Sequence, residues 1–176
     1  RGENPAAPLA VMTYYNLAYR MGHERFASGL ASAGISGCIL PDLPLEEFDI
    51  WSESATNYAI ETILLAAPTT PDERLLQICA RSAGFVYAVG LLGVTGMRSE
   101  LADSATEIAS RLKNVTSKPV LVGVGIGSPE QAVEACKVSD GVIVGSAIVQ
   151  EMINGSSPEE VGELVSTFRD ALDKNC

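Results

Sequence analysis

Six short aliphatic and β-branched runs alternate along the chain with longer amphipathic segments. Each run is continuously apolar, the pattern expected of a strand buried on both faces of a parallel sheet. The predicted strands cover residues 8–15, 37–40, 59–68, 84–89, 119–125 and 141–145.

Helix-start signals open the intervening segments. Thr70 precedes Pro71 and Ser128 precedes Pro129, with acidic residues in each first turn. The predicted helices cover residues 22–34, 44–57, 69–84, 102–114, 128–139 and 156–175, and a short extra helix covers 144–153. The chain therefore reads as six βα units in one domain over residues 1–176, or part of one, since no linker rich in Pro, Gly or Ser divides it.

Composition narrows the class of protein and its partners. The 176 residues are 47% hydrophobic and 19% charged, which is typical of a globular protein. The net charge of −10 argues against nucleic acid or an anionic membrane surface as a partner. No apolar run approaches the roughly 18 residues of a membrane span, and the N-terminus shows no secretory pattern, so a cytoplasmic location is expected.

Cysteine and histidine content argues against a metal site. The four cysteines form no CxxC pair, and His23 is the single histidine. We expect no metal, buried or inert thiols, and His23 as an exposed residue at a helix start after Gly22.

Two parallel folds compete at this point. A doubly wound dinucleotide-binding sheet needs G-x-G-x-x-G after an early strand, whereas Gly123, Gly125 and Gly127 form G-x-G-x-G late in the chain. A (β/α)8 TIM barrel instead places a phosphate site after its last two strands, beside a short extra helix. The α/β fold class expected is therefore this barrel, with about six of its βα units present.

The segments after the last two predicted strands suit an anion. The stretch "VLVGVGIGSPEQ" exposes backbone amides, and Gly145-Ser146 opens the short helix. Amides at a helix N-terminus, its dipole and the Ser146 hydroxyl would all face a phosphate. Three or four such hydrogen bonds, each worth about 1.5 to 3 kcal/mol to a charged group, could hold a phosphomonoester without lysine. Turn chemistry remains an alternative for any one of these glycines.

Four segments, in this order and spacing, carry a family resemblance. Residues 41–47 "PDLPLEE", 87–98 "YAVGLLGVTGMR", 122–131 "VGVGIGSPEQ" and 141–149 "GVIVGSAIV" resemble the tryptophan synthase alpha chain family over essentially the whole chain. The resemblance implies a lyase of tryptophan biosynthesis that cleaves indole-3-glycerol phosphate into indole and glyceraldehyde 3-phosphate. It implies a β chain as partner in an α2β2 tetramer, with pyridoxal phosphate only in that β chain and no cofactor in the α chain.

The same resemblance implies that part of the barrel lies upstream. A complete barrel of this type has about 250 residues, and this chain matches from just before the third strand to the C-terminus, about three quarters of it. The family's catalytic Glu and Asp are then expected upstream, with no catalytic residue in this chain. Asp49, Glu53 and Glu61 are interpreted as residues of a solvated helix face or a strand start.

Residues of the binding site are carried over by position. The phosphate ligands implied are Gly96, Gly125, Gly145 and Ser146, and the pocket residues for the indole and glycerol parts are Met12, Tyr87, Thr95 and Gly123. Tyr87 could equally be a core residue. Thr95 would belong to a loop that closes over substrate, and Gly90-Leu91-Leu92 departs from the polar residues of many relatives, which affects the expected closure and coupling of that loop.

Partner contacts and alternatives complete the expectations. Asn16, Pro41, Asp42 and Pro44 match regions that face the β chain, and turn chemistry with Asp42 as a cap explains the same residues equally well. A non-catalytic module that binds phosphate and a partner, or another phosphate-binding barrel enzyme, are the alternative functions. The "LPDLP" and "GVTG" segments favour the lyase over another barrel enzyme.

Overall fold

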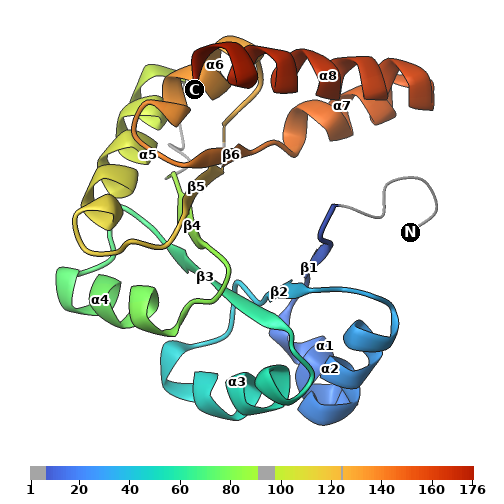
Figure 1. Cartoon of the computed structure of the whole chain (residues 1–176), viewed down its shortest axis with the longest axis vertical. Coiled ribbons are helices and arrows are strands. Elements are labelled where there is room, and N and C mark those ends of the chain that lie inside the picture. The colour runs from blue at the N-terminus through green and yellow to red at the C-terminus, as the bar shows by residue number, and fades with distance from the viewer. Residues whose placement is uncertain (1–6, 91–97, 124) are drawn as a thin grey trace. The chain divides into compact units, whose positions relative to one another are not determined.

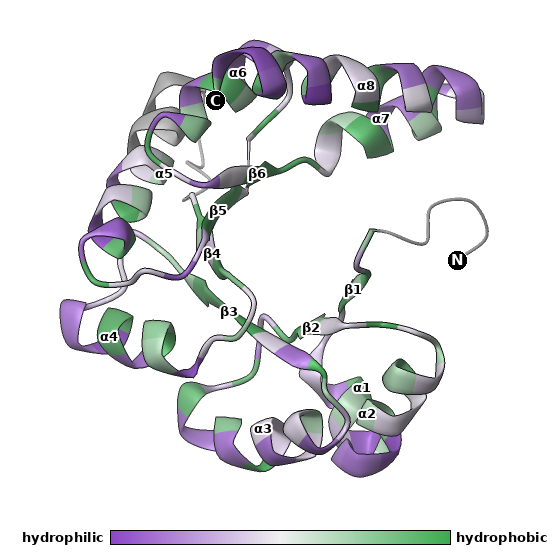
Figure 2. Cartoon of the chain, in the orientation of Figure 1, coloured by the Kyte–Doolittle hydropathy of each residue, from purple (hydrophilic) through white to green (hydrophobic). Residues whose placement is uncertain are grey.

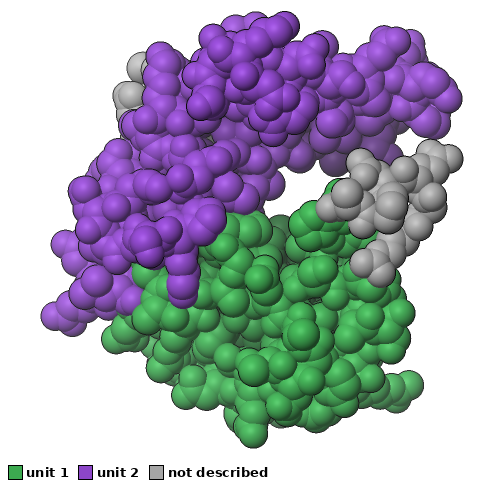
Figure 3. All heavy atoms as spheres, in the orientation of Figure 1, with its two compact units in different colours: residues 1–65, 77–86 green, residues 66–76, 87–176 purple. Residues whose placement is uncertain are grey.

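The structure is a computed structural model that describes residues 7–90, 98–123 and 125–176. The chain divides into two compact units, one of residues 1–65 with 77–86 and the other of residues 66–76 with 87–176 (Figure 3). The strand order in the sheet follows the chain order from β1 to β6. Parallel register is established for β1 with β2, β2 with β3, and β5 with β6, as the continuous apolar runs predicted.

The first unit holds the strands and helices of the N-terminal part of the chain. They are β1 (Ala10–Met12), α1 (Tyr15–Met21), α2 (His23–Ser32), β2 (Gly37–Ile39), the 3-10 turn η1 (Leu45–Glu47), α3 (Phe48–Asn57) and most of β3 (Glu61–Ala66). Cys38 on β2 pairs in register with Val11 and Thr62. Trp51 of α3 is almost fully buried and lies 5.7 Å, centroid to centroid, from the ring of Phe26 on α2.

The second unit carries the remaining strands and helices. They are β4 (Val86–Val89, from Tyr87 onward), α5 (Arg98–Lys113), β5 (Val120–Gly123), α6 (Pro129–Cys136), β6 (Gly141–Ile143), α7 (Ser146–Asn154) and α8 (Pro158–Asn175). Helix α4 (Asp72–Arg81) has residues in both units. Within this unit α8 runs beside α6 and α7 (Figure 1). Figure 2 shows the strands largely in green and much of α8 in purple, so apolar residues concentrate at the sheet.

One predicted strand is wrong over half its length. The run at residues 8–15 forms a strand only over Ala10–Met12, and α1 begins at Tyr15. The Asp42 carboxylate accepts a hydrogen bond from the Tyr15 backbone amide at 2.7 Å, which caps α1 from a loop 27 residues away. This distant cap outweighs the β-propensity of the two tyrosines.

Two expectations about single residue types are also wrong. His23 begins α2 as predicted but is half-buried, and its ring stacks on Tyr15 with 5.6 Å between centroids. Cys136 and Cys176 form a disulfide, whereas Cys38 and Cys79 are buried thiols as expected. The spacing of 40 residues gave no signal for this bond, because only the packing of α8 on α6 brings the two sulfurs together.

In the described ranges, no helix is both long and apolar enough to cross a membrane.

Candidate functional site

The predicted phosphate loops lie at one end of two paired strands. Gly123 is in register with Ile143, and these are the last paired positions of β5 and β6. Gly125 and Gly145 each stand two residues beyond that pair. Because the strands are parallel, both glycines follow carboxyl ends at the same edge of the sheet, where barrel enzymes place their active sites.

Helix α7 begins without any cap from its own side chains. Gly145 is its N-cap residue, no side chain makes a capping hydrogen bond there, and its first turn has no acidic residue. The neighbouring helices α6 and α8 differ, because the side chains of their N-cap residues, Ser128 and Ser157, each accept a hydrogen bond from a backbone amide. The first amides of α7 and its positive dipole end are therefore left for a ligand anion.

Among the described residues, no packing contact requires a glycine at position 145. Its φ of −128° is open to any residue, and a Cβ built there would meet no atom within 4 Å. The space that a side chain would fill at this position is therefore open to a ligand.

The loop after β5 offers fewer amides than its glycine content suggested. Gly125 has a φ of +82°, which favours glycine for conformational reasons. The Gly127 amide already donates to the Gln131 side-chain oxygen at 2.7 Å. Gln131 is thus a residue that the sequence analysis missed, and it leaves Gly125 as the exposed glycine available in this loop.

Tyr87 and Gly123, both predicted as pocket residues, lie in direct contact. A Cβ built on Gly123 would stand 2.2 Å from Tyr87 Cε2 and 2.3 Å from its Oη, so the tyrosine ring packs against the bare backbone of β5. The adjoining Gly90 amide donates to the Gly123 carbonyl at 3.4 Å. Tyr87 is 8% exposed, and burial raises the pKa of its hydroxyl above the usual value, which keeps it protonated at neutral pH.

Of the remaining predicted pocket and phosphate residues, the structure describes Met12 but not Thr95 or Gly96. Met12 ends β1 in the first unit, with 55% of its surface exposed. Thr95 and Gly96 lie outside the described residues, as do Leu91 and Leu92. Their assignments stay predictions.

The four predicted partner residues are exposed in the first unit. Asn16 lies on α1, and Pro41, Asp42 and Pro44 lie between β2 and η1. The Asp42 cap on Tyr15 joins the two segments. The capping interpretation of Asp42 is therefore confirmed, and an exposed surface made of both segments is available as well.

The three acids set aside as catalytic candidates all belong to the first unit, on α3 or at the start of β3. Asp49 is on α3 with 80% of its side chain exposed, and it pairs with Arg81 at 3.4 Å. Glu53 is also on α3, and Glu61 is the first residue of β3, at the opposite end from its carboxyl terminus. Across the ranges that the structure describes, no cluster of three metal-ligating side chains occurs.

Known proteins resemble this chain in sequence and in fold. The family model described as tryptophan synthase alpha chain matches residues 1–174. The tryptophan synthase alpha chain of Streptomyces avermitilis is 42% identical over 172 residues, which are 98% of this chain and 62% of that protein. The alpha chain of Methanocaldococcus jannaschii is 44% identical over 146 residues, covering 83% of this chain and 52% of that one.

Solved structures confirm the predicted fold class. The tryptophan synthase α2β2 complex of Pyrococcus furiosus contains a chain that superposes with a TM-score of 0.82 at 36% identity, over 94% of this chain and 67% of that one. A tryptophan synthase structure from Mycobacterium tuberculosis gives a TM-score of 0.84 at 37% identity, over 94% and 63%. The chain spans about 60% of the length of the first curated relatives it matches. On this evidence the chain belongs to the tryptophan synthase alpha chain family.

Proposed function

We propose that this chain supplies the phosphate-binding part of a lyase that cleaves indole-3-glycerol phosphate to indole and glyceraldehyde 3-phosphate in tryptophan biosynthesis. The observation that carries the proposal is the uncapped start of α7 at Gly145, beside Gly125 at the same strand edge, in a member of this family. The phosphate would accept hydrogen bonds from amides at Gly125 and Gly145 and from the Ser146 hydroxyl, with Gly96 as a further contact.

The organic part of the substrate would lie next to the phosphate. Tyr87 and Gly123, which pack against each other, are proposed by family correspondence to line the wall of this pocket. Met12 and Thr95 join them by family correspondence. A protonated Tyr87 hydroxyl can donate a hydrogen bond, but it is held too firmly by packing to act as a mobile acid.

The reaction itself is acid–base cleavage of a carbon–carbon bond. A proton added to indole C3 makes the ring a leaving group, and removal of the glycerol hydroxyl proton drives the scission, so two carboxyl groups are needed. The family's catalytic Glu and Asp match no position in this chain, so its own contribution is binding and orientation. No metal or bound cofactor enters the proposed chemistry, and pyridoxal phosphate belongs to the β chain.

A β chain is the proposed partner, in an α2β2 assembly in the cytoplasm. Support comes from the Pyrococcus furiosus relative, whose structure is described as an α2β2 complex. The exposed surface formed by Asn16, Pro41, Asp42 and Pro44 is the proposed contact. Its two segments are held together by the Asp42 cap, which would present them as one unit.

The test measures binding and turnover separately. The chain is titrated with an indole analogue that carries an uncleavable phosphate side chain, and indole release is assayed with and without the two upstream βα units of a relative, with a β chain added last. We expect binding by the chain, no release by the chain alone, and release once the added segment supplies the carboxylates, about 10²- to 10⁴-fold above background for each positioned group. Binding without release in the completed form would favour the non-catalytic module, and absence of binding would refute the phosphate assignment.

A further inference from the structure

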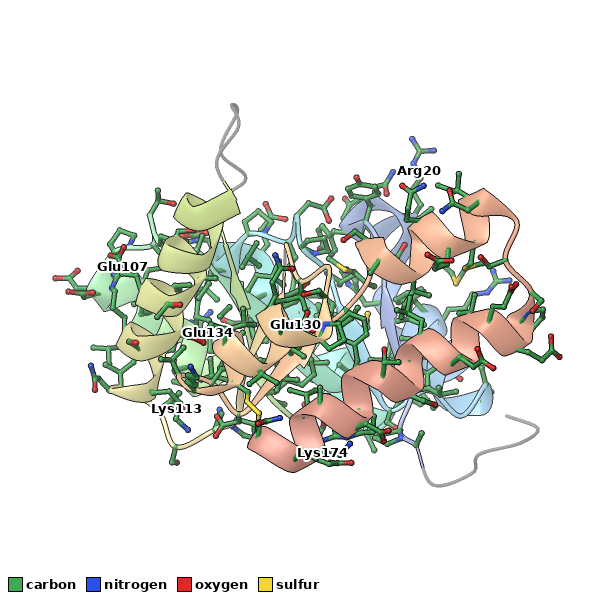
Figure 4. All side chains as sticks on the ribbon, turned by 90° about the horizontal axis from the view of Figure 1, so that it is seen from above. Arg20, Glu107, Lys113, Glu130, Glu134 and Lys174 are labelled. Carbon is green, nitrogen blue, oxygen red and sulfur yellow. A yellow bond between two sulfur atoms is a disulfide. The ribbon has the colours of Figure 1, made fainter. Side chains whose placement is uncertain are left out.

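A disulfide closes the end of the last helix onto α6. Cys136 is the last residue of α6, Cys176 follows α8 directly, and their Cα atoms are 6.3 Å apart. Figure 4 shows the bond in yellow between the two helices, near the labelled Lys174. Cys176 is exposed and Cys136 is half-buried, so a small thiol can reach the bond.

The helix held by this bond covers the phosphate loops. Phe168 of α8 is buried in a cluster with Ile126 and Ala132, and Ala147 packs against the same cluster. Ile126 follows Gly125, and Ala147 follows Ser146. The docking of α8 therefore supports both loops to which the phosphate is assigned.

Helix α8 has few other anchors. Phe168 is the one buried residue among its 18 residues, and Leu164 and Leu172 are partly buried against the same cluster. A surface helix with one fully buried side chain and a few half-buried ones opens locally more easily than a core helix. The disulfide at the end of α8 then contributes much of the stability with which this helix packs on α6.

We propose that the Cys136–Cys176 disulfide is a thiol-responsive clasp that sets the phosphate affinity of this site. This inference rests on the proposed phosphate-binding function. With the bond formed, α8 stays docked and the loops at Gly125 and Ser146 keep their geometry. With the bond reduced, the end of α8 opens and both loops lose part of their support.

The exchange step is ordinary thiol–disulfide chemistry with glutathione as the reductant. A glutathione thiolate attacks Cys176 Sγ, a bond forms between these sulfurs, and Cys136 leaves as a thiolate that takes up a proton. A second glutathione thiolate attacks the glutathione sulfur, which releases oxidised glutathione and the Cys176 thiolate, itself then protonated. Two electrons pass to the protein, and the reverse sequence with oxidised glutathione restores the bond.

The other two cysteines do not compete in this chemistry. Cys38 and Cys79 are both buried, and burial raises the pKa of Cys38 to about 12, which suppresses its reactive thiolate. Exchange in the folded protein is therefore confined to the pair on α6 and α8.

The experiment equilibrates the protein in glutathione buffers of stepped ratio and measures three quantities. Thiol content at residues 136 and 176 is read by mass spectrometry after alkylation, glycerol 3-phosphate affinity by calorimetry, and hydrogen exchange at residues 126–128 and 146–148. The control is the double variant Cys136→Ser/Cys176→Ser, which should bind like the reduced protein and ignore the buffer. Wild-type protein across the buffer series gives the result even if that variant folds poorly.

We expect the affinity to fall about five- to tenfold on reduction, at the low end of typical coupling between sites, with faster exchange in both loops. If neither form binds glycerol 3-phosphate, the proposed function fails and the control of phosphate affinity fails with it. Faster exchange at the loops on reduction would in that case still show that the bond holds α8 against them. Equal affinity and equal exchange in both forms would overturn the clasp. A bond that survives a large excess of reduced glutathione would also overturn it, since the disulfide would then be purely structural.

Discussion

Replacing Gly123 with alanine adds one methyl group directly against the ring of Tyr87. The new Cβ would lie 2.2 Å from Cε2, 2.3 Å from Oη and 2.5 Å from Cζ of that ring, distances that side-chain carbons do not tolerate. Tyr87 is only 8% exposed, so neighbouring residues enclose its ring. Either the ring or the β5 backbone must shift.

The expected cost follows from overpacking a well-filled site. Forced shifts of this kind cost about 1 to 3 kcal/mol of unfolding free energy. In a protein of this size each kcal/mol lowers Tm by about 2 to 4 °C, so Gly123→Ala should melt about 2 to 12 °C below wild type. Affinity for a phosphate-bearing indole analogue should fall as well, since both positions belong to the proposed pocket.

The partner of the clash is identified by a double-mutant cycle measured by denaturant unfolding. Tyr87→Leu removes the ring and should relieve Gly123→Ala by a coupling free energy of about 0.5 to 3 kcal/mol. Tyr87→Phe is the matched control, because it removes only Oη and leaves the contacts of Cε2 and Cζ. Additive effects in the cycle with leucine, or equal relief by phenylalanine, would refute this account of Gly123.

Three further changes test other parts of the molecule. Gly145→Asp should abolish glycerol 3-phosphate binding with little loss of stability, since its Cβ meets open space. The control Gly162→Asp on α8 adds the same charge in equally open space and should leave binding intact. Binding is measured by calorimetry and stability by unfolding curves, and equal loss of binding in the two variants would contradict the assignment of Gly145. Arg111→Met removes hydrogen bonds of 2.7 Å to two backbone carbonyls in the loop before α4 and should cost about 1.5 to 3 kcal/mol on chemical unfolding; an unchanged midpoint would contradict this. A hydrogen bond from Lys113, then one from a backbone amide, lowers the pKa of Asp140, so its stabilisation is present above the unfolded pKa of about 3.9 and is lost as pH falls through the lower folded pKa. Because Asp140 is 38% exposed, Asp140→Asn should cost less than about 1 kcal/mol near neutral pH, and unfolding curves from pH 7 downward should show this difference vanish in acid; a constant difference would exclude the pairing as its source.

The local pattern of residues determined the type and order of nearly every element. Continuous apolar runs placed all six strands within the predicted ranges, because a strand buried on both faces needs such a run whatever surrounds it. The prediction of burial is wrong for the edge strands β1 and β6, which hold no buried residue. Proline after Ser128 and Ser157 located the starts of α6 and α8, where both serines do cap their helices. Gly125 and Gly145 could be proposed as phosphate ligands from the sequence, because a glycine shows directly where the backbone carries no side chain.

Only the tertiary structure decided what depends on residues distant in sequence. The start of α1 inside a predicted strand depends on Asp42. The Gln131 side chain takes up the Gly127 amide, one of the backbone amides of the glycine-rich stretch. Ala59 ends the turn after α3 at a φ of +54°, a conformation for which the sequence offers no glycine as a signal. The Cys136–Cys176 bond likewise joins residues 40 positions apart, at the ends of α6 and α8. In each case a contact across many residues supplies free energy that outweighs the local preference, and a linear pattern carries no record of such a contact.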